Sequence, residues 1–259
     1  MILAGQTAIV TGAGVGIGHA TALALAEAGA NVVSVDINPE TAETTAHSVS
    51  LFQRRAISVQ ADMGALEDID RMVKRALEEF GRIDILVNNA GVTRRADIMD
   101  ITEADWDRIH RVNAKGVFFC LQRVAREMIP QRAGRIINIA SIAGKGYVHT
   151  SNAAYAASKG AVISLTKTAS QQLGGFNINV NSICPGVTRT ALGMANLAVR
   201  ARQEGISEAE LSRRQEEAIP IRRANDPEDI AAMAVFLASP GARNITGQCY
   251  NVDGGIIPD

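Results

Sequence analysis

The sequence predicts an α/β fold in which a parallel sheet is covered by helices on both faces. Short runs of β-branched and apolar residues alternate with longer segments whose apolar residues recur every three or four positions. The short runs are apolar at consecutive positions, as in strands buried on both faces. Such strands alternating with helices are typical of a doubly wound sheet. No segment rich in proline, glycine or serine divides the chain, so we expect one domain over residues 1–259.

Seven of the short runs are the candidate strands. They occupy residues 7–10, 31–35, 56–60, 83–87, 135–140, 178–183 and 248–252. Helical periodicity is clear in residues 19–29 and 65–81, and a glycine closes each of these segments, as at many helix ends. Helices are also expected over residues 105–128 and 153–174. Both are apolar around much of their circumference, which suits contacts between subunits.

The segment 190–226 is the longest part of the chain without a candidate strand. It contains the polar, helical stretch GISEAELSRRQEEAIP, which suits a surface insertion better than a core element. We therefore expect residues 190–226 to form a lid over a substrate site.

Composition excludes several classes of function. The 26 basic and 27 acidic residues nearly balance, which gives no electrostatic reason to expect a nucleic acid or an anionic membrane as partner. No apolar run approaches the about 18 residues of a membrane span. The first residues lack a basic segment followed by an apolar one, so we expect no secretory signal and a cytoplasmic protein. The 3 cysteines and 4 histidines are too scattered for a metal site, and we expect none.

The first candidate strand runs directly into a glycine-rich turn and a helix. From Thr11 the pattern is T-G-x-x-x-G-x-G, with glycines at Gly12, Gly16 and Gly18. Glycines let the backbone approach a pyrophosphate, and the helix that follows offers unpaired N–H groups and the positive end of its dipole. The same composition also serves a merely tight turn from strand to helix, so the loop alone leaves both interpretations open.

Asp36 ends the second candidate strand, and its position favours a dinucleotide. It falls twenty residues after Gly16, where a carboxylate can accept hydrogen bonds from both hydroxyls of an adenosine ribose. The alternative is a turn-forming residue before Asn38 and Pro39. A carboxylate also repels a 2′-phosphate, and neither Val15 nor Ile37 supplies a cation to bind one. The sequence therefore favours NAD over NADP.

Further motifs follow in a fixed order. NNAG stands at 88–91, RVNAKG at 111–116, Ser141 after the fifth strand, AAYAASKG at 153–160, CPGVTRT at 184–190 and YNVDGG at 250–255. Together with the glycine pattern, they resemble the short-chain dehydrogenase/reductase family along essentially the whole chain. The resemblance implies a Rossmann-type sheet of seven strands, an NAD-dependent oxidoreductase and a homotetramer.

The resemblance also implies roles for individual residues. Tyr155 would exchange a proton with the substrate oxygen, Lys159 would lower the pKa of that tyrosine and bind the nicotinamide ribose, Ser141 would hold the substrate oxygen, and Asn113 would anchor a water of the proton relay. Asp62 is expected at the adenine. The implied cofactor-binding residues, besides Tyr155 and Lys159, are Gly12, Gly16, Ile17, Gly18, Asp36, Asp62, Met63, Asn89, Ala90, Gly91, Pro185, Gly186, Thr188 and Thr190. Thr188 replaces the family's usual branched aliphatic residue, so only its backbone is expected to contact the cofactor.

Physical chemistry independently supports the tyrosine–lysine pair. The unperturbed pKa of a phenol, about 10, is too high for a base at neutral pH, and a nearby positive charge favours the phenolate. Residues four apart lie on one face of a helix, so Tyr155 and Lys159 can point into one cleft. Taken singly, a buried structural tyrosine, a surface lysine and a helix-capping Ser141 are the alternatives. Cys184, beside Pro185, has no base partner in the sequence, and core packing is the preferred interpretation.

The substrate is the least determined part of the sequence. Basic residues stand in three loops expected at the carboxyl edge of the sheet, and an anionic substrate would suit them. The candidates are Arg94, Lys145 and His149, with Arg95 and Arg189 in the same loops. Alternatively they are solvated, or they contact the cofactor phosphates or a neighbouring subunit.

We therefore expect an NAD-dependent oxidoreductase that interconverts a secondary alcohol and a ketone. The polar segment 190–219 favours a small-molecule substrate such as a polyol, a sugar or a hydroxy acid. The alternatives are an enzyme like 3-oxoacyl-(acyl carrier protein) reductase and a non-catalytic module that binds NAD(H).

Overall fold

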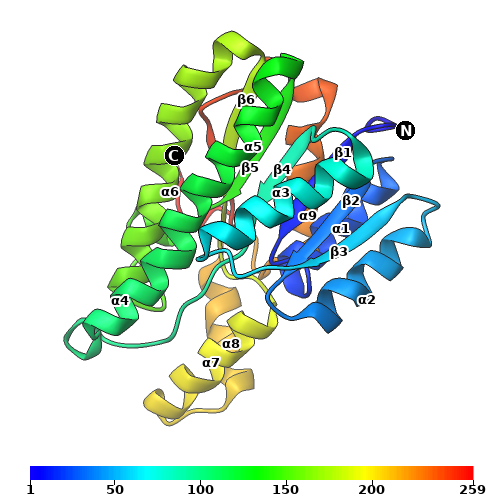
Figure 1. Cartoon of the computed structure of the whole chain (residues 1–259). Helices are drawn as coiled ribbons and strands as arrows, with labels where there is room; N and C mark the ends of the chain where they lie inside the picture. Colours follow the sequence, from blue (N-terminus) through cyan, green and yellow to red (C-terminus); the bar gives the residue numbers. More distant parts are fainter. Residues whose placement is uncertain (259) are drawn as a thin grey trace.

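A seven-stranded parallel sheet forms the centre of the protein (Figure 1). The computed structural model describes residues 1–258. The strand order is β3-β2-β1-β4-β5-β6-β7, and each neighbouring pair is parallel. The strands are β1 (Thr7–Thr11), β2 (Asn31–Asp36), β3 (Ala56–Gln60), β4 (Ile85–Asn88), β5 (Gly134–Ile139), β6 (Ile178–Pro185) and β7 (Cys249–Val252). The predicted fold class and all seven predicted strands are confirmed.

Helices cover both faces of this sheet. They are α1 (Gly16–Glu27), α2 (Pro39–Ser50), α3 (Leu66–Phe80), α4 (Glu103–His110), α5 (Val117–Gln131), α6 (Ala153–Leu173), α7 (Ala191–Glu204), α8 (Glu208–Ala218) and α9 (Pro227–Ala238). Apolar residues of α3, α5 and α6 pack on one face of the sheet, and apolar residues of α1, α2 and α9 pack on the other.

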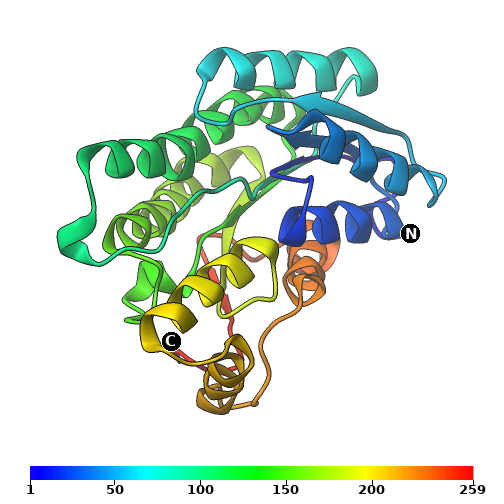
Figure 2. The ribbon, with the colours of Figure 1, turned by 90° about the horizontal axis from the view of Figure 1, so that it is seen from below.

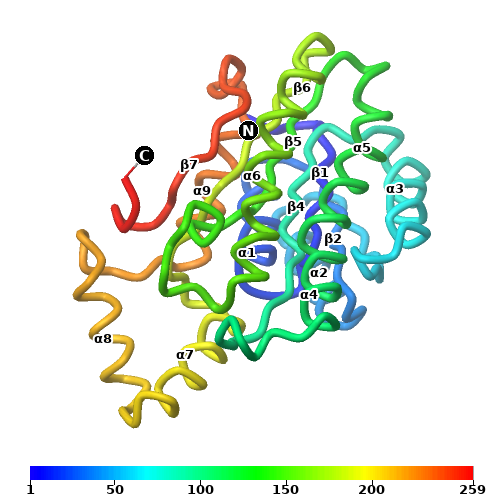
Figure 3. The backbone as a smooth tube through the Cα atoms, turned by 90° about the vertical axis from the view of Figure 1, so that its left-hand side faces the viewer, coloured from blue at the N-terminus to red at the C-terminus, as the bar shows by residue number. Residues whose placement is uncertain are grey.

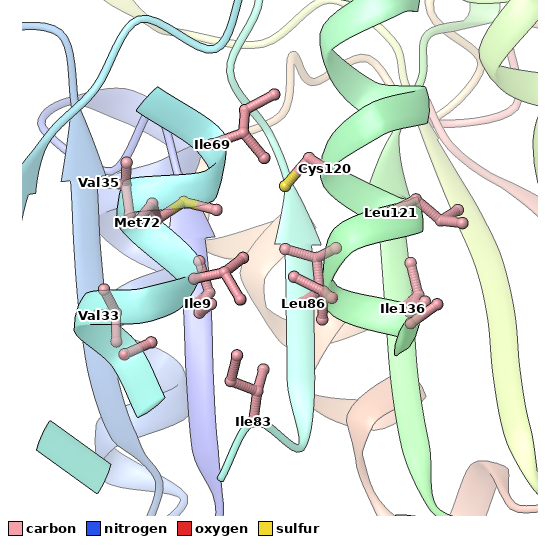
Figure 4. Packing of buried hydrophobic residues seen from close by; sticks show 14 of the residues in the cluster. Ile9, Val33, Val35, Ile69, Met72, Ile83, Leu86, Cys120, Leu121 and Ile136 are labelled. Atoms are coloured by element: carbon pink, nitrogen blue, oxygen red, sulfur yellow. The ribbon is translucent and has the colours of Figure 1, made fainter. Parts of the chain in front are cut away.

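Consecutive strand residues point to opposite faces, which is why the strands are apolar throughout. In β1, Ile9 joins one buried cluster, while Ala8 and Val10 join the other. Figure 4 shows Ile9 and its neighbours on adjacent strands facing Met72 of α3 and Cys120 of α5. Burial on both faces fixes the register of each strand, because a slip by one residue would exchange the two sets of side chains.

The strand order reverses in the middle of the sheet, next to β1. The chain moves outward from β1 through β2 to β3, then returns to place β4 on the other side of β1. The loops after β1 and β4 therefore diverge at the carboxyl edge of the sheet and leave a crevice there. Ligands of open α/β sheets bind at this switch point.

The expected helix over residues 105–128 is interrupted. After α4 the chain forms a π-helical turn over Arg111–Gly116 and then continues as α5. A π-helical turn contains about one residue more than an α-helical turn, and apolar periodicity does not reveal this difference. Short π-helical turns often occur at functional sites, and this one contains Asn113.

Residues 190–226 form a helical hairpin rather than part of the sheet layers. Thr190 caps α7 and Ser207 caps α8, each accepting a hydrogen bond from a backbone N–H three residues on. The two helices pack on each other through a small separate cluster around Leu197 and Leu211. The hairpin projects from the carboxyl edge of the sheet, as Figures 2 and 3 show from two directions. No helix within residues 1–258 is long and apolar enough to cross a membrane.

Candidate active site

A cleft of about 700 Å³ lies at the carboxyl edge of the sheet, beneath the α7–α8 hairpin. Most of the residues expected to bind cofactor or substrate line it. They are Gly12, Gly16, Ile17, Asp36, Asp62, Met63, Asn89, Ala90, Gly91, Ser141, His149, Tyr155, Lys159, Pro185, Gly186, Thr188 and Thr190. Among the expected residues, Gly18, Arg94, Asn113 and Lys145 lie outside this lining.

The glycine loop brings backbone against backbone. Gly12 has a φ of +61°, and a Cβ there would lie 2.8 Å from the Cα of Ala90. A Cβ on Gly18 would lie 2.0 Å from the carbonyl oxygen of Gly12, which explains why Gly18 belongs to the loop without reaching the cleft. Val15 precedes α1 and gives it no side-chain cap, so the first N–H groups of α1 open on the cleft. An uncapped helix start of this kind favours an anion.

Thr11 and Asn89 tie this loop to the end of β4. The Asn89 side-chain amide donates to the carbonyl oxygens of Thr11 and Gly12, each at 2.9 Å. In return, the Thr11 hydroxyl oxygen accepts from the backbone N–H of Asn89 at 3.0 Å and of Ala90 at 3.1 Å. These side chains thus join the loop after β1 to the loop after β4. The hydrogen bonds of its hydroxyl give a structural reason for Thr11 at the start of the glycine pattern.

The Asp36 carboxylate is oriented by two backbone amides. Its Oδ2 accepts from the N–H of Gly14 at 2.9 Å, and its Oδ1 accepts from the N–H of Asn38 at 3.0 Å. Asp36 therefore shapes the turn before α2 and also lines the cleft, so its role in the turn leaves it placed where a ligand could reach it. Each carboxylate oxygen keeps a further lone pair for a ligand hydroxyl.

Asp62 has a partner that the sequence patterns did not indicate. Its Oδ1 accepts from the N–H of Gly64 at 2.8 Å, and its Oδ2 receives the guanidinium of Arg111 at 2.8 Å. Arg111 belongs to the π-helical turn. The same turn meets the loop after β3 a second time, because a Cβ on Gly116 would lie 2.1 Å from the carbonyl oxygen of Met63.

Tyr155 and Lys159 lie one turn apart on α6, and the helix start is fixed by Asn152, whose Oδ1 accepts from the N–H of Tyr155 at 2.7 Å. Lys159 is only 3% exposed, and its Nζ donates to the carbonyl oxygen of Ile139, at the end of β5, at 2.7 Å. The Nζ lies 5.8 Å from the centre of the Tyr155 ring. A lysine ammonium so buried keeps one firm acceptor and faces the phenol.

Burial acts on the pKa of both groups. It raises the pKa of Tyr155 above its ordinary value, and the hydrogen bond from Ser141 opposes that rise. It lowers the pKa of Lys159 to about 8. Ser141 follows β5 and reaches the same end of the cleft. The cleft thus brings together a phenol, a hydroxyl that hydrogen-bonds to it and an ammonium group. Such a set of groups can transfer a proton to or from an oxygen atom.

Asn113 is fully buried, and its side chain joins three segments of the chain. Its Oδ1 accepts from the N–H of Val92 at 2.8 Å, and its Nδ2 donates to the carbonyl oxygen of Val92 at 2.9 Å and to Ser158 Oγ at 3.2 Å. Ser158 precedes Lys159 on α6. The side chain therefore connects the π-helical turn, the segment after β4 and the helix that bears the tyrosine–lysine pair.

Relatives of known activity match the chain over its whole length. A sorbitol dehydrogenase from Cereibacter sphaeroides is 42% identical over 256 residues, which cover 98% of each chain. A 3-oxoacyl-(acyl carrier protein) reductase from Thermotoga maritima is 37% identical over 257 residues, which cover 99% of this chain and 100% of the relative. A family model described as enoyl-(acyl carrier protein) reductase matches residues 12–257.

The chain belongs to the short-chain dehydrogenase/reductase family. Among solved structures, an NAD⁺-bound xylitol dehydrogenase superposes with a TM-score of 0.93 at 34% identity and covers 98% of this chain and 100% of its own. This short-chain dehydrogenase/reductase is therefore an oxidoreductase. Its cleft lies where the strand order of the sheet reverses beside β1.

Within this oxidoreductase the three basic candidates occupy different positions. His149 is exposed at the rim of the cleft and packs edge-on against Tyr147. Arg94 turns away and forms a bidentate ion pair with Asp105, with N–O distances of 2.5 and 2.6 Å. Lys145 donates to the carbonyl oxygen of Cys249 at 2.8 Å, on β7. Neighbouring arginines in a loop point in different directions, and the sequence carries no signal for which one faces the cleft.

Cys184 lies in β6 and is fully buried in a cluster with Val117 and Val162. This placement agrees with the interpretation of core packing. Thr188, on the loop after β6, lines the cleft, and its hydroxyl donates back to the carbonyl oxygen of Gly186 at 3.1 Å.

Proposed function

We propose that this protein is an NAD-dependent dehydrogenase that interconverts a secondary alcohol and a ketone on a small, polar substrate. The observation that carries the proposal is the joint placement of Ser141, Tyr155 and Lys159 in the cleft that Asp36 also lines. A group that moves a proton at an oxygen atom and a carboxylate suited to a ribose are thereby present in one site.

The residues of the cleft fit a nicotinamide dinucleotide. The Gly12 backbone leaves a cradle that a side chain would close, the uncapped start of α1 suits a pyrophosphate, and Asp36 offers oxygen acceptors for ribose hydroxyls. Lys159 and Asn89 to Gly91 would lie along the nicotinamide half. When bound, the nicotinamide supplies the acceptor or donor of a hydride at the alcohol carbon.

The protein's own residues manage the proton. In oxidation, the Tyr155 oxygen takes the proton of the substrate hydroxyl, while the Ser141 hydroxyl donates a hydrogen bond to the substrate oxygen and holds it in place. The Lys159 ammonium, fixed by the Ile139 carbonyl, favours the phenolate form electrostatically. In reduction, the same phenol returns the proton to the oxygen.

Asp36 supports NAD as the nucleotide. A 2′-phosphate on the adenosine ribose would meet the Asp36 carboxylate, and two like charges in contact repel. Both oxygens of Asp36 are already oriented by backbone amides, so the carboxylate cannot turn away without the loss of those bonds.

A 3-oxoacyl-(acyl carrier protein) reductase is the second candidate, favoured by the 37% identity to the enzyme from Thermotoga maritima. The two functions differ in substrate size and direction. An acyl thioester reductase should accept 3-oxoacyl thioesters and reduce them, whereas a polyol or hydroxy acid dehydrogenase should ignore them. Assay of acetoacetyl thioesters alongside alcohols separates the two.

The experiment that tests the proposed function follows the absorbance of NADH with a panel of polyols, sugars and hydroxy acids. The wild-type protein should reduce NAD⁺ with at least one of them. Tyr155→Phe should lower kcat by about 10²- to 10⁴-fold, because the proton acceptor is removed while the ring remains. Turnover that survives this substitution would contradict the assigned role of Tyr155, and a wild-type protein that binds NADH but oxidises nothing would favour a binding module.

A further inference from the structure

Five arginines line the cleft, and they differ in what neutralises them. Three are hydrogen-bonded to a carboxylate: Arg111 to Asp62, Arg189 to Glu216 and Asp226, and Arg200 to Glu204. Within residues 1–258, Arg95 and Arg108 have no carboxylate at ion-pair distance. Arg108 is exposed on α4, whereas Arg95 is partly buried. Among the described residues, Arg95 is therefore the one partly buried arginine of the cleft without a carboxylate partner.

Arg95 is held loosely by neutral acceptors. Its Nε donates to Gln203 Oε1 and its Nη1 to the carbonyl oxygen of Thr150, both at 3.3 Å. A guanidinium has five N–H donors, and hydrogen bonds to charged oxygens are shorter and stronger than these. An anion brought to Arg95 would meet unused donors, and it would exchange weak contacts for strong ones.

The position of Arg95 is tied to the start of the helix that bears Tyr155. Thr93 Oγ1 lies 2.6 Å from Ser151 Oγ, and the Asn152 side-chain amide donates to the carbonyl oxygen of Arg94 at 2.6 Å. Asn152 also caps α6 three residues before Tyr155. A substrate group bound to Arg95 would therefore be held by a loop that a few hydrogen bonds connect to the start of the helix bearing Tyr155.

The surroundings keep a positive balance. Arg200 of α7 also lines the cleft, and its Nε lies 2.6 Å from Glu204 Oε1. Glu204 is also within the electrostatic reach of Arg95. Two arginines against one glutamate leave one positive charge, and Ser151 and His149 line the same cleft.

We propose that Arg95 binds the anionic group of the substrate, so that the natural substrate is a small alcohol that carries a carboxylate, phosphate or sulfonate. This inference rests on the proposed function, because it names the substrate class of the same site. Of the two adjacent arginines of the loop, Arg94 is occupied by Asp105 and Arg95 is available. The planar guanidinium fork matches a carboxylate with two parallel hydrogen bonds.

The test compares matched pairs of alcohols that differ by the anionic group. The pairs are 3-hydroxybutyrate and its amide, sorbitol 6-phosphate and sorbitol, and 2-hydroxypropanesulfonate and 2-propanol. In at least one pair the wild type should show a kcat/KM higher by about tenfold or more for the anion. Arg95→Met should abolish that preference mainly through KM, Arg95→Lys should restore part of it, and the neutral partner should change less than about twofold. Which pair responds identifies the anion.

Arg108→Met is the matched control, because it removes a second cleft arginine that has no carboxylate partner. If it lowers the anion preference as much as Arg95→Met, general attraction by the cleft replaces the proposed anchor. Equal losses on anionic and neutral alcohols in Arg95→Met would also overturn the proposal, as would a wild type that prefers the neutral member of all three pairs.

A calorimetric titration of the NADH complex with the same three anions separates this proposal from the proposed function. Binding that Arg95→Met loses and Arg108→Met keeps supports the anchor even if no alcohol is oxidised. Oxidation of alcohols without any such Arg95-dependent binding supports the dehydrogenase and overturns the anchor.

Discussion

Lys159 shows how burial and function are balanced at a single side chain. Its ammonium has lost nearly all contact with water and keeps the Ile139 carbonyl as a hydrogen-bond acceptor. Desolvation disfavours the charged form, and its pKa accordingly falls to about 8. A group with this pKa is mostly protonated at neutral pH and loses its charge at moderately alkaline pH. The proposed mechanism requires the charged form beside the phenol.

The pH dependence of oxidation should report on this pair. Oxidation needs the Tyr155 phenolate, so kcat/KM should rise with pH as Tyr155 deprotonates. Lys159→Met removes the positive charge that favours the phenolate and should move this rise to higher pH. The measurement is the pH profile of alcohol oxidation from about pH 6 upward to about pH 11, which covers the Lys159 pKa of about 8 and the rise in rate as Tyr155 loses its proton. An unshifted profile with a raised KM for NAD⁺ would assign Lys159 to cofactor binding alone.

Asp36 gives a second prediction at the residue scale. Asp36→Ala removes acceptors for the ribose and should raise KM for NAD⁺ by about tenfold or more. It also removes the repulsion of a 2′-phosphate, so the preference for NAD⁺ over NADP⁺ should narrow. Asp36→Asn is the matched control, because it keeps an oxygen for the Gly14 N–H while it removes the charge and the second acceptor oxygen. An unchanged ratio of kcat/KM for the two nucleotides in both variants would assign Asp36 to the turn alone.

Single residues were predictable from the sequence where backbone geometry dictates them. The glycines, Asp36, Ser141 and Tyr155 stand at the ends of strands or on one helix face, and the parallel sheet brings them to one edge. Arg94 and Arg95 are different, because the direction of a loop side chain depends on partners distant in sequence, such as Asp105 and Gln203. Those partners become visible only in three dimensions.

The π-helical turn over Arg111–Gly116 is an element that the sequence did not predict, and the ranges of α2 and α9 were not predicted either. Apolar periodicity locates strands well because burial on both faces leaves a continuous apolar run. A single extra residue shifts the phase of a helical pattern by about 100°. Residues 105–128 are apolar around much of their circumference, so this shift leaves no visible break in the pattern. The turn is nevertheless a contact point, since it carries Arg111 to Asp62 and Asn113 to Val92.

Gly116→Ala tests how tightly that turn is packed. The added Cβ would lie 2.1 Å from the Met63 carbonyl oxygen, so the loop after β3 or the turn must shift. We expect the free energy of unfolding to fall by about 1–3 kcal/mol in urea denaturation. Gly174→Ala is the control, because a Cβ at that position meets nothing within 4 Å, and its effect should stay within about 0.5 kcal/mol. Equal stability of the two variants would show that the contact yields without cost.

On the scale of the whole molecule, the reversal of strand order beside β1 determines where chemistry is possible. Every cleft-lining loop leaves the same edge of the sheet, and this much follows from the predicted alternation of strands and helices. The assembly of the chains does not follow from it, because apolar helix faces serve both a core and an interface.

The homotetramer implied by the family resemblance is therefore a prediction to be measured. Trp106 on α4 and Phe118 on α5 are 45% and 41% exposed, which suits an interface over these helices. Light scattering should give a mass near four times 27.4 kDa, and Phe118→Asp should lower it. Met99→Asp is the control, because Met99 is an exposed apolar residue outside these helices. A monomeric wild type would refute the expectation.

The α7–α8 hairpin has its own small apolar cluster around Leu197 and Leu211, distinct from the clusters on the sheet. It also lines the cleft, through residues such as Leu192, Met194 and Arg200. We therefore expect substitutions in the hairpin to leave the sheet folded and Tyr155 in place. Evolution of an enzyme with this architecture would change the accepted substrate through the hairpin and keep the reaction at the edge of the sheet. Laboratory evolution of a new substrate range should therefore begin in the hairpin.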